Sequence, residues 1–148
     1  MFAVSLWIVL PLFALLAASI VIELRTGLIL DVLTLPSIAY FLVATAIVGA
    51  HPFWQHLLAG IAIAAAFIVG GITVPHARGR GERIGMGAVK LLTATAIALG
   101  LVEAGAMSIG FVLLALVAAA VTSRQRAIPS SPLTAVTTIG VLLLGWGR

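Results

Sequence analysis

The chain has 148 residues, of which 63% are hydrophobic and only 8% charged, and it contains no cysteine. A soluble domain of this length could not bury so much apolar surface, so the composition excludes one and predicts an integral membrane protein. The formal charge of +4 predicts basic loops that set membrane topology rather than nucleic-acid binding, and the lack of cysteine excludes disulfides and cysteine-based metal sites.

Charges and prolines divide the chain into six apolar segments. In lipid each segment has to be helical, because every backbone polar group needs an internal partner. The first segment lacks the basic leading region of a signal peptide, so we expect it to be retained. The sequence therefore predicts a single all-α membrane domain over residues 1–148. It is a bundle of six transmembrane helices at about 2–22, 32–50, 56–74, 85–102, 104–122 and 132–147.

The basic residues predict the orientation of this bundle. With six alternating spans, only Arg148 falls on one side of the membrane. The other seven basic residues share the opposite side: Arg25, Arg78, Arg80, Arg83, Lys90, Arg124 and Arg126. Because basic loops are retained in the cytoplasm, we expect these loops to be cytoplasmic and both termini to lie outside.

Two of the four acidic residues stand out by position. Glu23 closes the first apolar segment, and an ionisable group at a membrane boundary is a candidate functional residue. An interfacial anchor paired with Arg25 explains Glu23 equally well. Asp31 precedes the second segment, where a substrate contact or a helix cap is expected.

The fourth segment opens with Gly85 and Gly87, which permit close approach of another chain. Lys90 follows one turn later and can extend its amine to the membrane interface. The predicted topology puts this segment's start on the same membrane face as Glu23. Glu23 and Ala88 could therefore face each other across the bundle at equal depth.

Two stretches of the sequence resemble the motifs of a known family. Residues 23–36, ELRTGLILDVLTLP, resemble the segment D-x-R-x-x-x-I-P-[DN]-x-L-T-L-P of type IV prepilin peptidases. Residues 85–100, GMGAVKLLTATAIALG, resemble their G-x-G-D-V-K-L-[LA] segment. Both motifs occur in the family's order, and the resemblance covers about residues 15–105. It is a resemblance to GxGD-type intramembrane aspartyl proteases.

The resemblance implies an activity and a substrate. Such enzymes remove the short basic leader from prepilins at the cytoplasmic face of the prokaryotic plasma membrane, without a cofactor or metal. One ionised aspartate activates water and one protonated aspartate polarises the scissile carbonyl, because two close like charges cannot both ionise. The cysteine-containing methyltransferase domain of larger members has no counterpart here, so we expect the short form without that activity.

Carried onto this sequence, the first aspartate position is Glu23 and the second is Ala88. Both depart from the family pattern, since Glu23 is one methylene longer and Ala88 has no carboxyl group. Leu30 also replaces the usual proline. The resemblance implies supporting roles for matching positions: Arg25, Asp31, Pro36, Gly85, Gly87 and Lys90.

As written, the pair of acids cannot form, and the sequence leaves the explanation open. Ala88 could be an engineered inactivating change or a feature of a natural degenerate paralogue. A non-catalytic scaffold that binds prepilins in pilus or secretion assembly is therefore an alternative, and homo-oligomerisation stays open. A small transporter is disfavoured because polar groups in mid-membrane are lacking, with His56 expected at the outer interface.

Overall fold

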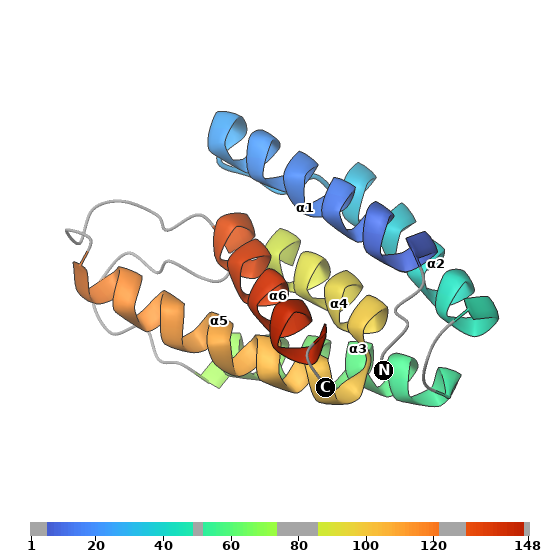
Figure 1. Ribbon diagram of the computed structural model, residues 1–148. Helices are drawn as coiled ribbons and strands as arrows, with labels where there is room; N and C mark the ends of the chain where they lie inside the picture. Colours follow the sequence, from blue (N-terminus) through green and yellow to red (C-terminus); the bar gives the residue numbers. More distant parts are fainter. Residues whose placement is uncertain (1–5, 49–51, 74–85, 122–129, 147–148) are drawn as a thin grey trace.

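Six helices make up the regular structure of the described residues, which are 6–48, 52–73, 86–121 and 130–146 of a computed structural model (Figure 1). The predicted all-α fold with six helices is confirmed. The helices are α1 (Leu6–Thr26), α2 (Asp31–Val48), α3 (Phe53–Thr73), α4 (Met86–Leu99), α5 (Leu101–Val121) and α6 (Ser130–Trp146). Six of the basic residues that predict the orientation lie outside the described residues, as does Gly85: Arg78, Arg80, Arg83, Arg124, Arg126 and Arg148.

Helix α4 is the centre of the bundle. Ten of its 14 residues are buried, and it packs against each of the other five helices (Figure 1). Its sequence alternates alanine with leucine, isoleucine and threonine, so it offers an apolar surface on all sides and small side chains for close packing. Helix α4 is therefore held from several directions.

Two helices, α1 and α2, are long and apolar enough to cross a membrane. The other four contribute shorter apolar stretches among the described residues. Large apolar side chains point outward from α1 and α2, among them Trp7, Val32 and Ile47 with exposed fractions of 72%, 86% and 75%. Such an exposed apolar surface suits a lipid environment.

Two glycines end helices at places that differ from the predicted boundaries. Gly27 adopts φ 71° and donates its N–H to the Glu23 carbonyl at 2.7 Å, so α1 continues through Glu23 and stops at Thr26 instead of at residue 22. Gly100 adopts φ 94° and ends α4 at Leu99, with α5 beginning directly after it. Glycine reaches this left-handed conformation without steric cost, which explains both ends.

Polar side chains satisfy backbone groups that the helices leave open. Pro11 has no N–H to donate to the Trp7 carbonyl, and the Tyr40 hydroxyl of α2 donates to that carbonyl at 2.7 Å. His56, which was expected near the outer membrane interface, lies in the first turn of α3. It is buried, and its Nδ1 donates to the Ile97 carbonyl at 2.8 Å. That carbonyl belongs to the last turn of α4, where intrahelical donors run out.

Candidate functional site

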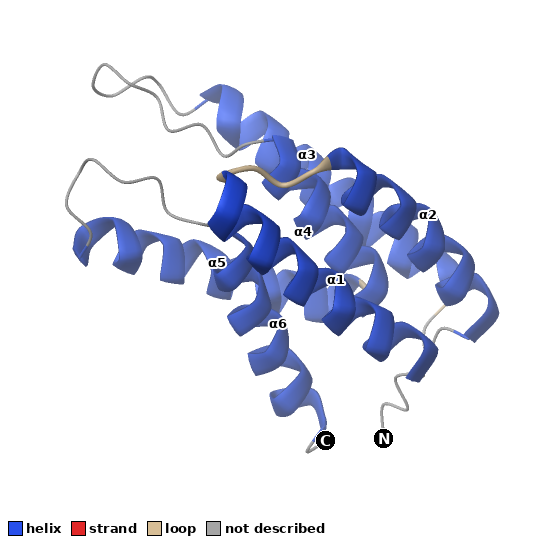
Figure 2. Ribbon diagram, turned by 90° about the horizontal axis from the view of Figure 1, so that it is seen from above, coloured by secondary structure: helices blue, strands red, loops and turns tan. Residues whose placement is uncertain are grey.

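The candidate site lies at one end of the bundle, where α1 ends and α2, α4 and α6 begin. Figure 2 shows the connection between α1 and α2, residues 27–30, in tan at this end. Residues 23–36 pass from α1 into α2, and the described part of 85–100 forms α4. The two sequence motifs meet in space because α4 packs against both α1 and α2.

Glu23 is bound by the first turn of α6. Its Oε1 accepts hydrogen bonds from the Ser130 backbone N–H at 3.0 Å and from the Ser130 hydroxyl at 2.9 Å. Its Oε2 accepts one from the Ser131 N–H at 2.7 Å. The first N–H groups of a helix lack intrahelical acceptors, and the helix dipole favours negative charge there. Because α6 has no acidic residue in its own first turn, α1 supplies the capping carboxylate.

Ala88 occupies the first turn of α4 and is 5% exposed. Its neighbour Gly87 contacts Ile29, in the connection that follows α1, so Ala88 lies at the same end of the bundle as Glu23. The methyl group of Ala88 neither donates nor accepts a proton. The three hydrogen bonds that the Glu23 carboxylate accepts all come from α6.

Gly87 lies against the backbone of the α1–α2 connection. A Cβ built at this position would lie 2.8 Å from the Ile29 carbonyl oxygen and 2.9 Å from the Ile29 Cβ. Both distances are shorter than van der Waals contact, so a side chain larger than hydrogen does not fit unless the backbone moves. The glycine expected from the sequence to permit close approach does so here.

Replacing Gly87 with alanine is expected to lower the free energy of unfolding by about 1–3 kcal/mol, because the new methyl group overpacks the backbone at Ile29. Gly105→Ala is the matched control, since nothing lies within 4 Å of a Cβ there. A helical alanine should leave stability unchanged or raise it by about 0.5–1 kcal/mol. Reversible unfolding in detergent measures both, and equal effects would contradict the close contact.

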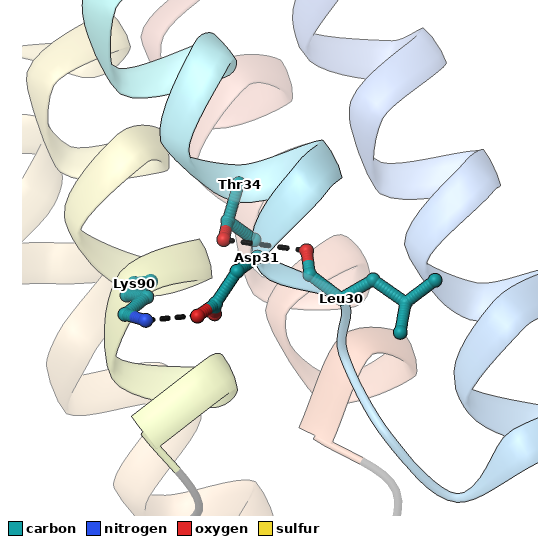
Figure 3. A network of polar contacts seen from close by, with 4 residues as sticks. All are labelled: Leu30, Asp31, Thr34 and Lys90. Atoms are coloured by element: carbon teal, nitrogen blue, oxygen red, sulfur yellow. Dashed lines mark hydrogen bonds and ion pairs between the residues drawn. The ribbon is translucent and has the colours of Figure 1, made fainter.

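Asp31 and Lys90 form an ion pair that joins α2 to α4, with Lys90 Nζ 2.7 Å from Asp31 Oδ1 (Figure 3). Asp31 is the first residue of α2, where a carboxylate also interacts favourably with the helix dipole. The Lys90 amine, which the sequence allows to extend to the membrane interface, binds this carboxylate. In Figure 3 the Leu30 side chain points away from the pair.

The Asp31–Lys90 pair is expected to contribute little to stability, because the side chains are 57% and 26% exposed. A double-mutant cycle with Asp31→Asn and Lys90→Met should give a coupling energy of about 0.2–1 kcal/mol. A coupling energy above about 2 kcal/mol would contradict the solvent screening assumed here.

Arg25 and Pro36 stand apart from these contacts. Arg25 is exposed in the last turn of α1, where a positive charge complements the helix dipole. Pro36 is exposed within α2. Of the predicted site residues that the structure describes, Asp31 and Lys90 contact each other directly, Gly87 contacts the segment before Asp31, and Glu23 binds α6.

The sequence model of the type IV leader peptidase family matches residues 8–124 of the chain. The chain belongs to this family. A comparison with curated proteins finds no match, and neither does a comparison with solved structures. The type IV leader peptidase match includes both motif segments, and it supports a peptidase-type function in the context of type IV pili and prepilin-like substrates. It ends before α6, which holds the partners of Glu23.

Ser130 and Ser131 are residues of the candidate site that the sequence analysis missed. The sixth segment was expected to begin at Pro132, whereas α6 begins at Ser130. Serine before an apolar run is a signal for a helix start, and it would have placed the boundary correctly. It would not have indicated Glu23 as the capping partner. Within the described ranges, no group of three His, Cys, Asp or Glu residues is arranged to hold a metal ion.

Proposed function

We propose that this chain is a membrane-embedded peptidase of the prepilin type whose catalytic positions are 23 and 88, acting on prepilin leaders at the cytoplasmic membrane face. The observation that carries the proposal is the contact between the two motif segments. Gly87 packs against Ile29, and Lys90 pairs with Asp31. The family match covers both segments.

The chemistry expected at these positions needs two carboxyl groups of opposite protonation state. One takes a proton from the attacking water, and the other donates a hydrogen bond to the scissile carbonyl. Glu23 can supply the first group, and Ala88 cannot supply the second. The chain as written should therefore bind a prepilin and cut it slowly or not at all.

The test is a cleavage assay in membrane vesicles with a prepilin that carries a basic leader and an apolar helix. We expect no released leader with the chain as written and measurable release with Ala88→Asp. Vesicles that lack the chain give the background rate of leader release. Leader release by the unmodified chain at the rate of the Ala88→Asp variant would refute the assignment of position 88.

A non-catalytic prepilin-binding scaffold is the second candidate function, and the state of Glu23 favours it. Both carboxylate oxygens of Glu23 are bound by α6, as expected of a residue that holds two helices together. A photo-crosslinking group in the apolar part of the prepilin separates the two functions. The scaffold predicts crosslinks to the unmodified chain together with no cleavage by any variant at positions 23 and 88.

The proposed orientation has a separate test. Six spans with both termini outside predict that cysteines introduced at Arg80 and Arg148 react with a membrane-impermeant reagent from opposite sides of the membrane. The absence of natural cysteines makes the labelling specific. Reaction of both cysteines from the same side would contradict this topology.

A further inference from the structure

The connection between α1 and α2, residues 27–30, carries two large apolar side chains on its outer surface. Leu28 and Leu30 are 66% and 44% exposed. The exposed apolar surface continues on both sides of the connection, to Leu24 in the last turn of α1 and to Val32 at the start of α2. We call these four residues the apolar rim.

Leu28 and Leu30 lie on the outer side of the connection. Ile29, between them, is half-buried, packs against the core and contacts Gly87 at the start of α4. The connection therefore turns one apolar side chain toward α4 and leaves its two neighbours outside. Figure 3 shows the Leu30 side chain pointing away from Lys90 of α4.

Charged groups flank the apolar rim, so it lies at the level where an apolar span meets water. Arg25 is exposed in the last turn of α1, and Asp31, which is 57% exposed, is the first residue of α2. Such charges are costly among acyl chains. Large apolar side chains grouped in water are also unfavourable, and they mark contact with a membrane or with another protein. The apolar rim therefore needs a partner at this end of the bundle.

The length of α1 indicates the lipid headgroup layer as this partner. The 21 residues of α1 extend over about 31 Å. This length is close to the thickness of the hydrocarbon core of a bilayer, about 30 Å, so the connection falls in the polar layer of about 5–7 Å beyond it. Apolar side chains of interfacial segments reach the acyl boundary from this layer. Arg25 in the same layer is suited to lipid phosphate groups.

Several backbone groups of the connection are bound within the protein. The Gly27 N–H donates to a carbonyl in the last turn of α1 at 2.7 Å, and the Leu28 N–H donates to the Thr26 hydroxyl oxygen at 3.2 Å. The Leu30 carbonyl accepts a hydrogen bond from the Leu33 N–H at 3.0 Å. Non-helical backbone enters a membrane only where its polar groups find partners in the protein. The connection meets this requirement at these three groups.

We propose that the apolar rim inserts into the membrane interface, with Leu28 and Leu30 at the boundary between the headgroups and the acyl chains. A contact between two copies of the chain is disfavoured, because a stable protein interface takes about 20–30 residues a side. The insertion sets the depth of the bundle and places the candidate site at the membrane surface. It rests on the membrane embedding included in the proposed function and not on the catalytic chemistry.

Spin labels on single cysteines test the insertion, because the chain has no natural cysteine. The full chain carries Leu28→Cys or Leu30→Cys in vesicles of phosphatidylethanolamine and phosphatidylglycerol. Collisions of the label with oxygen, which concentrates among acyl chains, are compared with collisions with a water-soluble nickel chelate. Val43→Cys, at an exposed residue of α2, is the lipid reference, and a soluble peptide with the same label is the water reference. We expect the oxygen-to-nickel ratio at both leucine positions to lie several-fold above the water reference.

Three outcomes would overturn the proposal, and they differ in what else they refute. A water-like ratio at position 28 or 30, with a lipid-like ratio at Val43→Cys, would refute the insertion and leave the membrane embedding intact. A water-like ratio at Val43→Cys as well would refute the membrane embedding and the insertion with it. Few collisions with either reagent at position 28 or 30 would show that protein covers the apolar rim, in a contact between copies.

Photo-labelling of the unmodified chain gives an independent measurement. One phosphatidylglycerol carries a photoreactive group in the first carbons of its acyl chain, and a second carries it at the chain end. Mass spectrometry locates each label. We expect the first lipid to label residues 24–32 and the second to label α2 around Val43. Labelling around Val43 by the second lipid, with no label on residues 24–32 from the first, would contradict the insertion.

Discussion

Adding Glu23→Asp to a chain that carries Ala88→Asp is expected to raise the rate of prepilin cleavage about a hundredfold over Ala88→Asp alone. In the single variant, three donors of α6 still hold the Glu23 carboxylate. An aspartate is one methylene shorter and cannot reach all three donors. The shorter carboxylate can then approach the aspartate introduced at position 88, as in the family motif, where both positions are aspartates. A misplacement of about 1 Å accounts for a rate effect of this size.

Initial rates of leader release at saturating prepilin measure this effect, with equal amounts of each variant in the same vesicles. Glu23→Asp alone is the control, and it should stay inactive because position 88 still lacks a carboxyl group. Equal rates for Ala88→Asp with and without Glu23→Asp would show that the length of the side chain at position 23 does not limit the reaction.

Removing the carboxylate of Glu23 is expected to lower stability more than removing the other described carboxylate at this end of the bundle, that of Asp31. Glu23→Ala leaves three donors at the start of α6 without their acceptor. Losing a helix cap and hydrogen bonds to a charged group should lower the free energy of unfolding by about 2 kcal/mol.

Asp31→Ala is the matched control for Glu23→Ala, because it also removes a carboxylate from this end of the bundle. Asp31 is 57% exposed, so its loss should change the free energy of unfolding by less than about 1 kcal/mol. Reversible unfolding in detergent compares the two variants. A smaller loss for Glu23→Ala than for Asp31→Ala would contradict the role of Glu23 as the cap of α6.

The sequence predicts the helices of this fold well and their ends less well. Long uncharged runs require helices in lipid, and six helices are found. The ends of α1 and α4 depend instead on single backbone conformations at Gly27 and Gly100. Hydropathy carries no information on these conformations, so the boundaries at residues 22 and 102 are each shifted by several residues.

Part of the candidate site could also be predicted from the sequence, and part could not. The two motifs predict that their segments lie at one end of the bundle, and the contacts of Gly87 and Lys90 agree with this. The partners of Glu23 are 107 and 108 residues away in the chain. Such a pairing follows from how α6 packs on α1, for which neither the local pattern nor the motif provides a signal.

The most direct test of the central claim is the amount of leader released per prepilin by the chain carrying both Ala88→Asp and Glu23→Asp, relative to the chain as written. Mass spectrometry of the released leader also gives the site of cleavage. The account predicts release at least about a hundredfold above the unmodified chain, in line with the contribution of a positioned acid and base. No leader release by a folded, membrane-inserted double variant, with every candidate prepilin, would contradict it.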